Sequence, residues 1–343
     1  MKYRRLGDSD LEVSEISLGS WLTYGVGVEA DKARACLEKA FAVGINFIDT
    51  ANVYTEGQSE EFVGGALKAL GLPRSQTIIA TKATGGMGQG KNESGFSRKH
   101  VLDQIDASLA RLQLDYVDLY QIHAWDPHTP MEEALRALED IVRSGRARHV
   151  GVSNWAAWQI MKGLGIQQRR GWDTFVSLQA YYTVAGRDLE RELGPLLASE
   201  GVGLMVWSPL AGGLLSGKYK LNANGEIEGE GRRASFDFPV VDKERAMALV
   251  EAMRPIAEAK GVSVAGIALA WLLYQPVVST VIVGAKRAEQ LAENLAASDI
   301  ELSRDELAML DELSALPREY PGWMFAMQGQ YFADKVSPRR RAE

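Results

Sequence analysis

Four residues whose side chains could together protonate a reactive oxygen occur between positions 49 and 123: Asp49, Tyr54, Lys82 and His123. A tyrosine hydroxyl, with a pKa of about 10, is a weak proton donor at neutral pH. A nearby ammonium held by a carboxylate should lower the pKa of the tyrosine and stabilise the phenolate left after proton transfer. A histidine beside them can hydrogen-bond a carbonyl oxygen and orient it. This set suits protonation of an alkoxide that forms as a hydride reaches carbon.

Three of the four residues end short apolar runs that predict buried strands, and the tyrosine lies five residues beyond the first run. A lysine at such a place must reach water or pair with an anion, and Asp49 is the available anion. Read alone, Asp49 suits a helix cap, and Lys82 or His123 suits a solvated rim position. Their occurrence at three consecutive strand ends favours a shared site. The runs are residues 46–49, 77–82 and 117–123.

Short β-like runs alternate with amphipathic helical segments almost from end to end of the chain. Eight strands at spacings near thirty residues predict an α/β fold, a (β/α)8 TIM barrel, whose active site lies in the loops after the strand ends. Glycines at expected helix ends, and Asp31, Ser97 and Ser303 as N-caps, support the boundaries. The expected strands are 16–20, 46–49, 77–82, 117–123, 149–153, 175–180, 203–207 and 280–283. The expected helices are 31–43, 59–70, 98–112, 131–143, 155–164, 187–200, 242–260, 263–274, 287–297 and 303–315.

One interval departs from this rhythm. More than seventy residues separate the seventh and eighth strands, and they include the Gly- and charge-rich stretch 222–239 and two helices. A loop of this length is expected to be functional or disordered. No linker divides the chain, so we expect one domain over residues 1–315, which includes extra C-terminal helices. The tail over residues 316–343 is expected to pack in part and then to fray.

The bulk composition favours a globular cytoplasmic protein. The 343 residues are 46% apolar and 24% charged, which allows a substantial core. A formal net charge of −7 disfavours a nucleic-acid or anionic-membrane binder. The single cysteine, Cys36, excludes a disulfide framework within the chain. No apolar run reaches the ~20 residues of a membrane span, and the N-terminus lacks the pattern of a secretory signal, so no membrane insertion is expected.

Two other enzyme classes are alternatives, a Rossmann dehydrogenase and a metal hydrolase on the same barrel. Residues 25–30 match the G-x-G-x-x-A pattern of a dinucleotide-binding Rossmann fold, between an expected strand and an expected helix. However, residues 21–24 separate the strand from the first glycine, where that fold requires a tight turn, and the strand count is too high. A metal hydrolase is disfavoured because the four histidines do not cluster at metal-ligand spacing, so no metal is expected.

The residues around the four candidates resemble the aldo-keto reductase family. The motifs are Phe47-Ile48-Asp49-Thr50-Ala51 with Tyr54, then Thr81-Lys82, then Gln121-Ile122-His123. The resemblance runs from residue 2 to about residue 294 and is closest to the branch that includes the voltage-gated potassium-channel beta subunits. Further segments that carry it are 20–25, 130–133, 151–155, 207–210, 217–219 and 289–294.

The resemblance implies NAD(P)H-dependent carbonyl reduction on a barrel. In this interpretation Tyr54 is the acid, Lys82 and Asp49 tune it, and His123 orients the carbonyl. In animal channel beta subunits the position equivalent to His123 is commonly Asn. The histidine here therefore favours turnover over a purely sensory role.

The remaining strand ends supply groups that a nicotinamide cofactor needs. Ser153, Asn154 and Gln179 offer hydroxyl and amide groups for a carboxamide, and the resemblance places Tyr181 or Tyr182 against the nicotinamide ring. The glycines that follow the seventh strand would let backbone N–H groups approach a pyrophosphate. The expected cofactor-binding residues are Ser20, Trp21, Asp49, Ser153, Asn154, Gln179, Trp207, Ser208, Pro209, Leu210, Gly213, Lys218, Arg233, Gly284, Lys286, Gln290, Glu293 and Asn294.

Phosphate charge must be met locally, because the chain as a whole is acidic. Basic residues in the long cofactor loop and at the helix start after the last strand are the candidates, and that helix start also offers N-terminal amides. Lys286, Arg287 and Gln290 look placed for a 2′-phosphate, which favours NADP over NAD. By resemblance, Glu293 and Asn294 hold the adenine.

The chain departs from the family pattern at two places. The branch often carries Ser where this chain has Lys286, so the grip on a 2′-phosphate is expected to differ. The segment after Tyr54 is one residue longer than the commoner spacing, so the next helix is expected to start slightly displaced. Trp21 and Trp125 are expected to line an apolar substrate mouth.

The expected function is NADP(H)-dependent reduction of aldehydes or ketones to alcohols. The alternative is a nicotinamide-nucleotide-sensing regulatory subunit with slow turnover, like a potassium-channel beta subunit. The expected partner is a small-molecule carbonyl or alcohol, and a homo-oligomer is compatible with the sequence.

Overall fold

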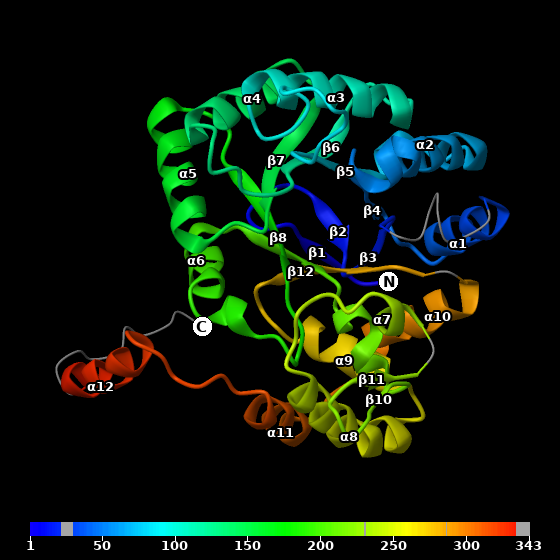
Figure 1. Cartoon of the computed structure of the whole chain (residues 1–343), viewed down its shortest axis with the longest axis vertical. Helices are drawn as coiled ribbons and strands as arrows, with labels where there is room; N and C mark the ends of the chain where they lie inside the picture. Colours follow the sequence, from blue (N-terminus) through cyan, green and yellow to red (C-terminus); the bar gives the residue numbers. More distant parts are fainter. Residues whose placement is uncertain (22–29, 230, 286, 334–343) are drawn as a thin grey trace, which may run out of the picture.

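Eight parallel strands close into a barrel surrounded by helices (Figure 1). The computed structural model describes residues 1–21, 30–229, 231–285 and 287–333. Each barrel strand pairs with the next along the chain, and β12 closes the ring between β9 and β3. Helices cover the outer face, so both faces are buried, which explains the continuous apolar runs. The strands are β3 (Ile16–Gly19), β4 (Phe47–Asp49), β5 (Ile78–Ala83), β6 (Val117–Ile122), β7 (Ala147–Ser153), β8 (Phe175–Tyr181), β9 (Gly203–Trp207) and β12 (Val278–Val283).

The predicted (β/α)8 barrel is confirmed, and all eight predicted strands are present within a few residues. The helices are α1 (Ala30–Ala42), α2 (Gln58–Leu70), α3 (Arg98–Leu112), α4 (Met131–Arg143), α5 (Ala157–Arg170), α6 (Leu193–Glu200), α7 (Arg232–Ser235), α8 (Lys243–Lys260), α9 (Val264–Leu273), α10 (Ala288–Ala296), α11 (Arg304–Leu313) and α12 (Gly322–Ala333). The helices other than α7 and α12 follow the predicted order with small shifts.

Two of the three predicted N-caps are confirmed. Ser97 Oγ accepts a hydrogen bond from the His100 backbone N–H, and Ser303 forms a reciprocal capping box with Glu306. The prediction for Asp31 is wrong, because α1 already begins at residue 30.

One predicted helix is divided into two elements. The segment 187–200 forms a 3-10 turn, η3 (Asp188–Glu190), followed by α6, which starts at Leu193. Pro195 lacks an N–H and is tolerated only in the first turn of a helix, so a continuous helix from residue 187 would be broken.

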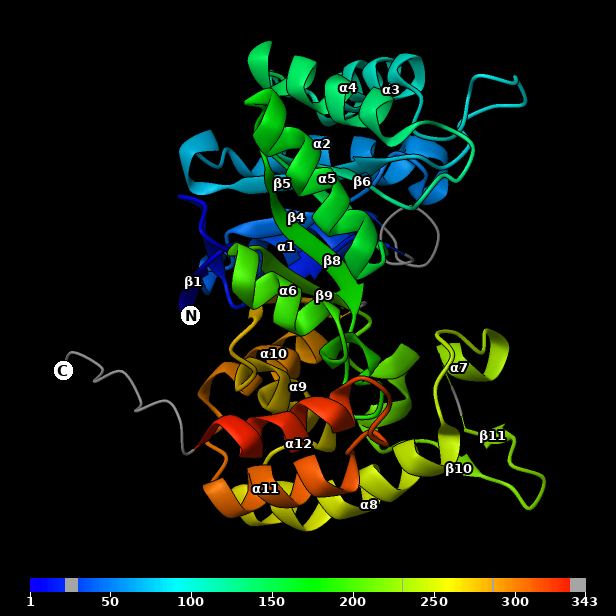
Figure 2. The same cartoon turned by 90° about the vertical axis from the view of Figure 1, so that its left-hand side faces the viewer.

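Two short antiparallel hairpins and the helices α7 and α12 were not predicted. The hairpins are β1 (Tyr3–Arg5) with β2 (Glu12–Ser14), and β10 (Lys220–Leu221) with β11 (Ile227–Glu228). Figure 2 shows the first hairpin at one end of the barrel and the second, with α7, on the opposite side. Runs of two or three residues are too short to give a clear period-2 signal.

The barrel interior is divided into an apolar lower part and a polar upper part. Inward-facing side chains alternate along each strand, so Phe47, Ala80 and Leu119 lie one layer below Asp49, Lys82 and Gln121. Leu6 and Val13 of the N-terminal hairpin join the apolar layer from below, and both are fully buried.

Gly7 lets the turn of this hairpin approach the barrel. The residue is left-handed (φ +58°), and a Cβ built on it would lie 2.3 Å from the Gly201 carbonyl oxygen. The next residue, Asp8, donates its backbone N–H to that same oxygen at 2.8 Å. The hairpin therefore closes the end of the barrel opposite the strand C-termini.

The tail after α11 contacts the barrel through Arg191, which donates to the Pro317 carbonyl oxygen at 3.1 Å and pairs with Glu319 at 3.2 Å. Helix α12 carries exposed Trp323, Phe325 and Met327, and Figure 1 shows it apart from α11. Residues 334–343 of the predicted tail lie outside the described residues.

Among the described helices, none is long and apolar enough to cross a membrane alone. The pair α8 and α9 reaches that length and composition only together, and the two helices are bent by 97° where they meet.

We expect Leu6→Ala to lower the free energy of unfolding by about 2–4 kcal/mol, because it leaves a cavity between the hairpin and the barrel interior. Urea denaturation measures this change. The matched control is Leu313→Ala on α11, whose side chain is 47% exposed, and its cost should stay below about 0.5 kcal/mol. Equal losses in the two variants would show that the hairpin does not seal the core.

Candidate active site

The ends of β4 and β5 bring Asp49 and Lys82 into direct contact inside the barrel. The Lys82 ammonium donates to Asp49 Oδ2 at 2.6 Å and to the Thr50 carbonyl oxygen at 2.8 Å. Its Nζ also lies 3.4 Å from the Tyr54 hydroxyl, which it approaches as a hydrogen-bond donor. Both charged side chains are buried. The ammonium thus links the carboxylate to the phenol.

Tyr54 begins a 3-10 turn, η1 (Tyr54–Gly57), that connects β4 to α2. Three consecutive residues after it are left-handed, with φ of +51° at Thr55, +52° at Glu56 and +92° at Gly57. Left-handed backbone is costly for a β-branched residue such as Thr55. The turn accommodates the longer spacing seen in the sequence, and α2 starts at Gln58.

His123 follows the end of β6 and faces Tyr54. The two ring centroids are 5.5 Å apart and the planes meet nearly edge to face, at 77°. The His123 backbone N–H donates to the Ala83 carbonyl oxygen at 3.0 Å, which continues the pairing of β6 with β5. All four predicted residues therefore gather at one end of the barrel.

Burial dominates the protonation of this cluster. It raises the pKa of the Tyr54 hydroxyl well above its ordinary value, and the negative charge of Asp49 adds to the increase. Burial also lowers the pKa of Lys82, against the opposing charge of Asp49, and raises the pKa of Asp49. The expectation of a lowered pKa for Tyr54 is wrong for this structure, because burial and the negative charge of Asp49 both raise it.

The imidazole of His123 is neutral near physiological pH. Burial, together with the positive charge of Lys82, lowers its pKa from 6.5 to about 3. A neutral ring keeps one N–H donor and one acceptor nitrogen. It can therefore donate a hydrogen bond without adding a second positive charge beside Lys82.

Ser153, Asn154 and Gln179 gather at the ends of β7 and β8. Ser153 Oγ donates to the Gln179 carbonyl oxygen at 2.9 Å, and Asn154 Nδ2 donates to Ser153 Oγ at 3.1 Å. Gln179 Nε2 donates to Asp49 Oδ1 at 2.8 Å, so this amide group adjoins the charged pair. Asn154 is left-handed (φ +59°) and its Oδ1 accepts from Trp207 Nε1 at 3.0 Å.

A row of neighbouring aromatic rings extends through space from Tyr54 to Tyr181. Trp21 lies 6.3 Å from Tyr54 and 6.0 Å from Phe238, measured between ring centroids. Phe238 stacks on Trp207 at 5.8 Å with only 6° between the planes, and Trp207 lies 5.2 Å from Tyr181. This row brings the long loop between β9 and β12 next to the four predicted residues.

Tyr181 and Tyr182 have different surroundings. Tyr181 belongs to the row just described. Tyr182 is buried against Trp271, with ring centroids 5.5 Å apart, and donates to Glu190 Oε1 at 2.6 Å. Only Tyr181 therefore lies beside the other candidates.

The segment after β9 forms a tight 3-10 turn, η4 (Ala211–Ser216), whose N–H groups are largely used within the segment. Ala211 and Gly213 donate to the carbonyl oxygens of Ser208 and Leu210, and Gly212 donates to Ser208 Oγ. Pro209 is buried at its start. The segment is ordered by its own hydrogen bonds, and the expected N–H donors already have partners.

The predicted phosphate-binding residues are in different environments. Arg233 is buried; it donates to the Ala211 carbonyl oxygen at 2.9 Å and pairs with Asp237 at 3.0 Å. Its guanidinium ties α7 to η4. Lys218 and Gly284 are exposed, as are Arg287, Gln290 and Glu293 at α10, whereas Asn294 is buried. Lys286 lies outside the described residues.

Two further expectations concern Ser20 and the tryptophans. Ser20 Oγ accepts from Ser59 Oγ at 2.7 Å and is buried behind the site. Trp125 packs 5.0 Å from the buried Trp155 and 5.9 Å from the exposed Trp158. Trp21 adjoins Tyr54, whereas Trp125 belongs to this separate aromatic cluster.

Sequence reasoning missed Phe238, Gln121 and Glu60. Phe238 lies in a loop without periodicity, so no local signal could place it beside Trp207. Gln121 was noticed only as part of a motif, although strand alternation places it in the barrel interior with Lys82. Glu60 lies in the longer segment that follows Tyr54, and it is fully buried.

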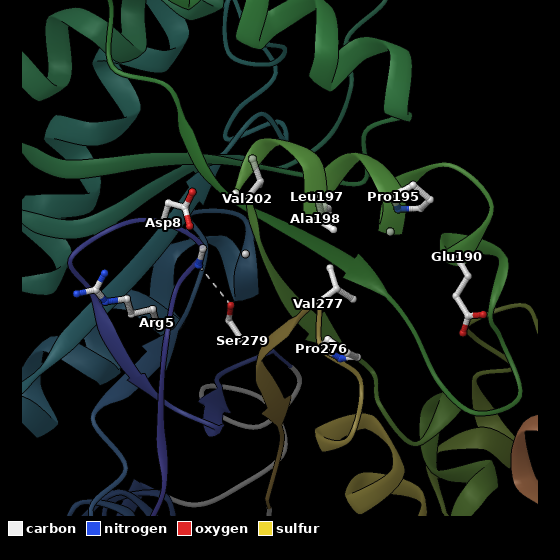
Figure 3. A pocket seen from close by; sticks show the side chains of 14 residues that line it. Arg5, Asp8, Glu190, Pro195, Leu197, Ala198, Val202, Pro276, Val277 and Ser279 are labelled. Carbon is white, nitrogen blue, oxygen red and sulfur yellow. Dashed lines mark hydrogen bonds between the residues drawn. The ribbon is translucent and has the colours of Figure 1, made fainter. Parts of the chain in front are cut away.

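A cavity of about 460 Å³ lies at the opposite end of the barrel (Figure 3). Its wall includes Asp8 of the N-terminal hairpin turn and Gly203 and Ser279 near the starts of β9 and β12. This cavity is separated from Lys82 by the apolar layer of the interior and takes no part in the candidate site.

Comparison with known proteins agrees with this geometry. The model of the "Aldo/keto reductase family" matches residues 15–315. This chain belongs to the aldo/keto reductase family. The family and the barrel indicate an oxidoreductase.

Relatives of this family member carry two kinds of name. A probable voltage-gated potassium channel subunit beta of Oryza sativa is 38% identical over 88% of this chain and 92% of its own length. A putative subunit of the same name from Schizosaccharomyces pombe is 39% identical over 91% and 92%. Versiconal hemiacetal acetate reductase of Aspergillus parasiticus is 36% identical over 94% and 99%.

The low pKa of His123 should make the protein less stable in acid. The folded state binds fewer protons than the unfolded state between about pH 3 and pH 6.5, so the free energy of unfolding falls as the pH decreases through that window. We expect a smaller fall in His123→Asn, measured by urea denaturation at a series of pH values. His128→Asn, which removes an exposed imidazole, is the control, and a smaller fall in that variant alone would contradict the assignment.

Proposed function

We propose that this protein reduces aldehydes or ketones to alcohols with NADPH, and that Tyr54 is the general acid. The carrying observation is the position of Lys82 Nζ, 2.6 Å from Asp49 Oδ2 and 3.4 Å from the Tyr54 hydroxyl. Membership of the aldo/keto reductase family supports the same reaction class.

In this proposal each side chain has one task. Tyr54 keeps its proton until a carbonyl oxygen gains negative charge, since burial disfavours the free phenolate. Lys82 donates a hydrogen bond to the phenolic oxygen and stabilises the charge that develops there. Asp49 holds the ammonium in place, and neutral His123 donates to the substrate oxygen and fixes its direction.

The residues around the row of rings fit a nicotinamide. The hydroxyl and amide groups of Ser153, Asn154 and Gln179 match a carboxamide, and the ring of Tyr181 offers a flat apolar surface beside Trp207. When bound, the reduced cofactor supplies the hydride for the carbonyl carbon. The buried pairing of Arg233 leaves its guanidinium to order the loop, and we assign phosphate binding to exposed side chains at α10.

We expect Tyr54→Phe to lower the carbonyl-dependent oxidation of NADPH by about 10²–10⁴-fold, because the proton donor is removed while the ring is retained. Absorbance at the nicotinamide band measures the rate with a panel of aldehydes, ketones and sugar-derived carbonyls. The affinity for NADPH, measured by calorimetry, should not change. Retained reduction in this variant would disprove the role of Tyr54.

Arg287→Ala should weaken NADPH binding about tenfold and leave NADH binding unchanged, because a charge-assisted hydrogen bond to a 2′-phosphate is lost. Calorimetric titration with each nucleotide measures the two affinities. Arg304→Ala removes an exposed arginine at the start of another helix, α11, and is the control. Equal loss for NADPH and NADH would contradict selection of the 2′-phosphate.

A nicotinamide-nucleotide-sensing subunit is the second candidate, and the names of two relatives favour it. It predicts tight NADPH binding with turnover below about 1 per second for every carbonyl tested, which is slow for an enzyme. Faster turnover that depends on Tyr54 favours the reductase. The neutral histidine beside Tyr54 supports turnover.

A further inference from the structure

Glu60 is a buried carboxylate next to the candidate site but outside the four residues discussed above. It lies in the first turn of α2 and is fully buried. Its Oε2 accepts from Arg111 Nε at 2.7 Å, and its Oε1 accepts from Thr81 Oγ1 at 2.5 Å. Thr81 immediately precedes Lys82 on β5, so the carboxylate lies behind the strand that carries the ammonium.

Ser59, which precedes Glu60 in the first turn of α2, contacts residues that follow the ends of β3 and β4. Ser59 Oγ donates to Ser20 Oγ at 2.7 Å and lies 3.2 Å from Thr50 Oγ1. The Thr50 carbonyl oxygen is also an acceptor of the Lys82 ammonium. The segment that carries Tyr54 is therefore held at both ends. At its start the Thr50 carbonyl oxygen contacts Lys82, and at its end Glu60 contacts Thr81, the residue before Lys82.

Charges of opposite sign alternate from the surface helix α3 to the barrel interior. Arg111 pairs with Glu60, and Lys82 pairs with Asp49. Burial lowers the pKa of Lys82, and the negative charges of Asp49 and Glu60 both oppose this effect. Glu60 is thus a second carboxylate that favours the charged form of the amine.

Other ionisable groups surround the same amine. Asp49 and Tyr54 face Lys82 from β4 and η1, and the charge of Lys82 acts on His123 after β6. Tyr120 on β6 is buried in the field of Glu60, and its hydroxyl donates to the Val101 carbonyl oxygen at 3.1 Å. Asp49 contacts Lys82 directly, whereas Glu60 acts on it from behind the strand.

We propose that Glu60 is a positioning residue for proton transfer, which keeps Lys82 charged and fixes the segment that carries Tyr54. The inference rests on the proposed function, because it assigns Lys82 to the stabilisation of Tyr54. A purely structural Glu60 would pack α2 against the barrel without changing the protonation of Lys82. The two roles predict different results for Glu60→Gln, which keeps the shape of the side chain but removes its charge. A positioning role changes the titration of Lys82, whereas a structural role does not.

The test is a titration of Lys82 by NMR in the full-length protein with isotopically labelled lysine, without cofactor or substrate. In Glu60→Gln the Lys82 signal should titrate at a lower pH than in the unmodified protein, because one of two stabilising negative charges is lost. Glu61→Gln removes the same charge from the exposed neighbouring position on α2 and should leave the titration unchanged.

A second variant keeps the test decisive if Glu60→Gln does not fold. Arg111→Gln removes the cation that neutralises Glu60, so the Lys82 signal should titrate at a higher pH. An unchanged titration in Glu60→Gln, or a shift to lower pH in Arg111→Gln, would overturn the proposal.

Kinetics then separate this inference from the proposed function. Glu60→Gln should lower kcat about tenfold, with unchanged affinity for NADPH, and should move the pH profile of kcat. A shifted Lys82 titration without carbonyl reduction in the unmodified protein would contradict the proposed function but retain the coupling between Glu60 and Lys82. Carbonyl reduction that keeps the same pH profile in Glu60→Gln would contradict the inference alone.

Discussion

The buried ion pair between Lys82 and Asp49 is the interaction on which the upper half of the barrel depends. Two opposite charges 2.6 Å apart in a buried site are tolerated only if each has further hydrogen-bond partners. The Thr50 carbonyl oxygen and the Gln179 amide supply them. The hydrogen bonds of this single ion pair therefore hold the ends of β4, β5 and β8 in register.

The chain separates this polar layer from its stabilising core. Below the ion pair the interior is apolar and is sealed by the N-terminal hairpin. Above it, the strained turn after Tyr54 and the left-handed Asn154 hold side chains around the pair. The apolar interior and the packing of the helices against the outer face of the strands stabilise the fold, so the end that carries the ion pair can contain unfavourable backbone and buried charge.

The sequence predicts the site best where a residue with reactive chemistry ends an apolar run typical of a buried strand. Apolar runs ending in Asp49, Lys82 and His123 specified three strands and their shared end, because strand order and side-chain alternation follow from the fold. The raised pKa of Tyr54 could not be predicted, since it follows from the depth of burial and from the position of the Asp49 charge, which only the structure gives. Phe238 could not be placed, because its contacts depend on how a long loop folds back. Arg233 was predicted as a cofactor-binding residue, but only the structure shows that it is buried and bound to the Ala211 carbonyl oxygen and to Asp237.

The stacked rings of Trp207 and Phe238 join two segments that lie about thirty residues apart in the chain. Trp21, from the opposite side, meets the same phenyl ring edge-on. Two indoles therefore share one neighbour on the loop. Any molecule that separates Trp21 and Trp207 from Phe238 must change the environment of both indoles. Tryptophan fluorescence therefore reports the position of this loop without an added dye.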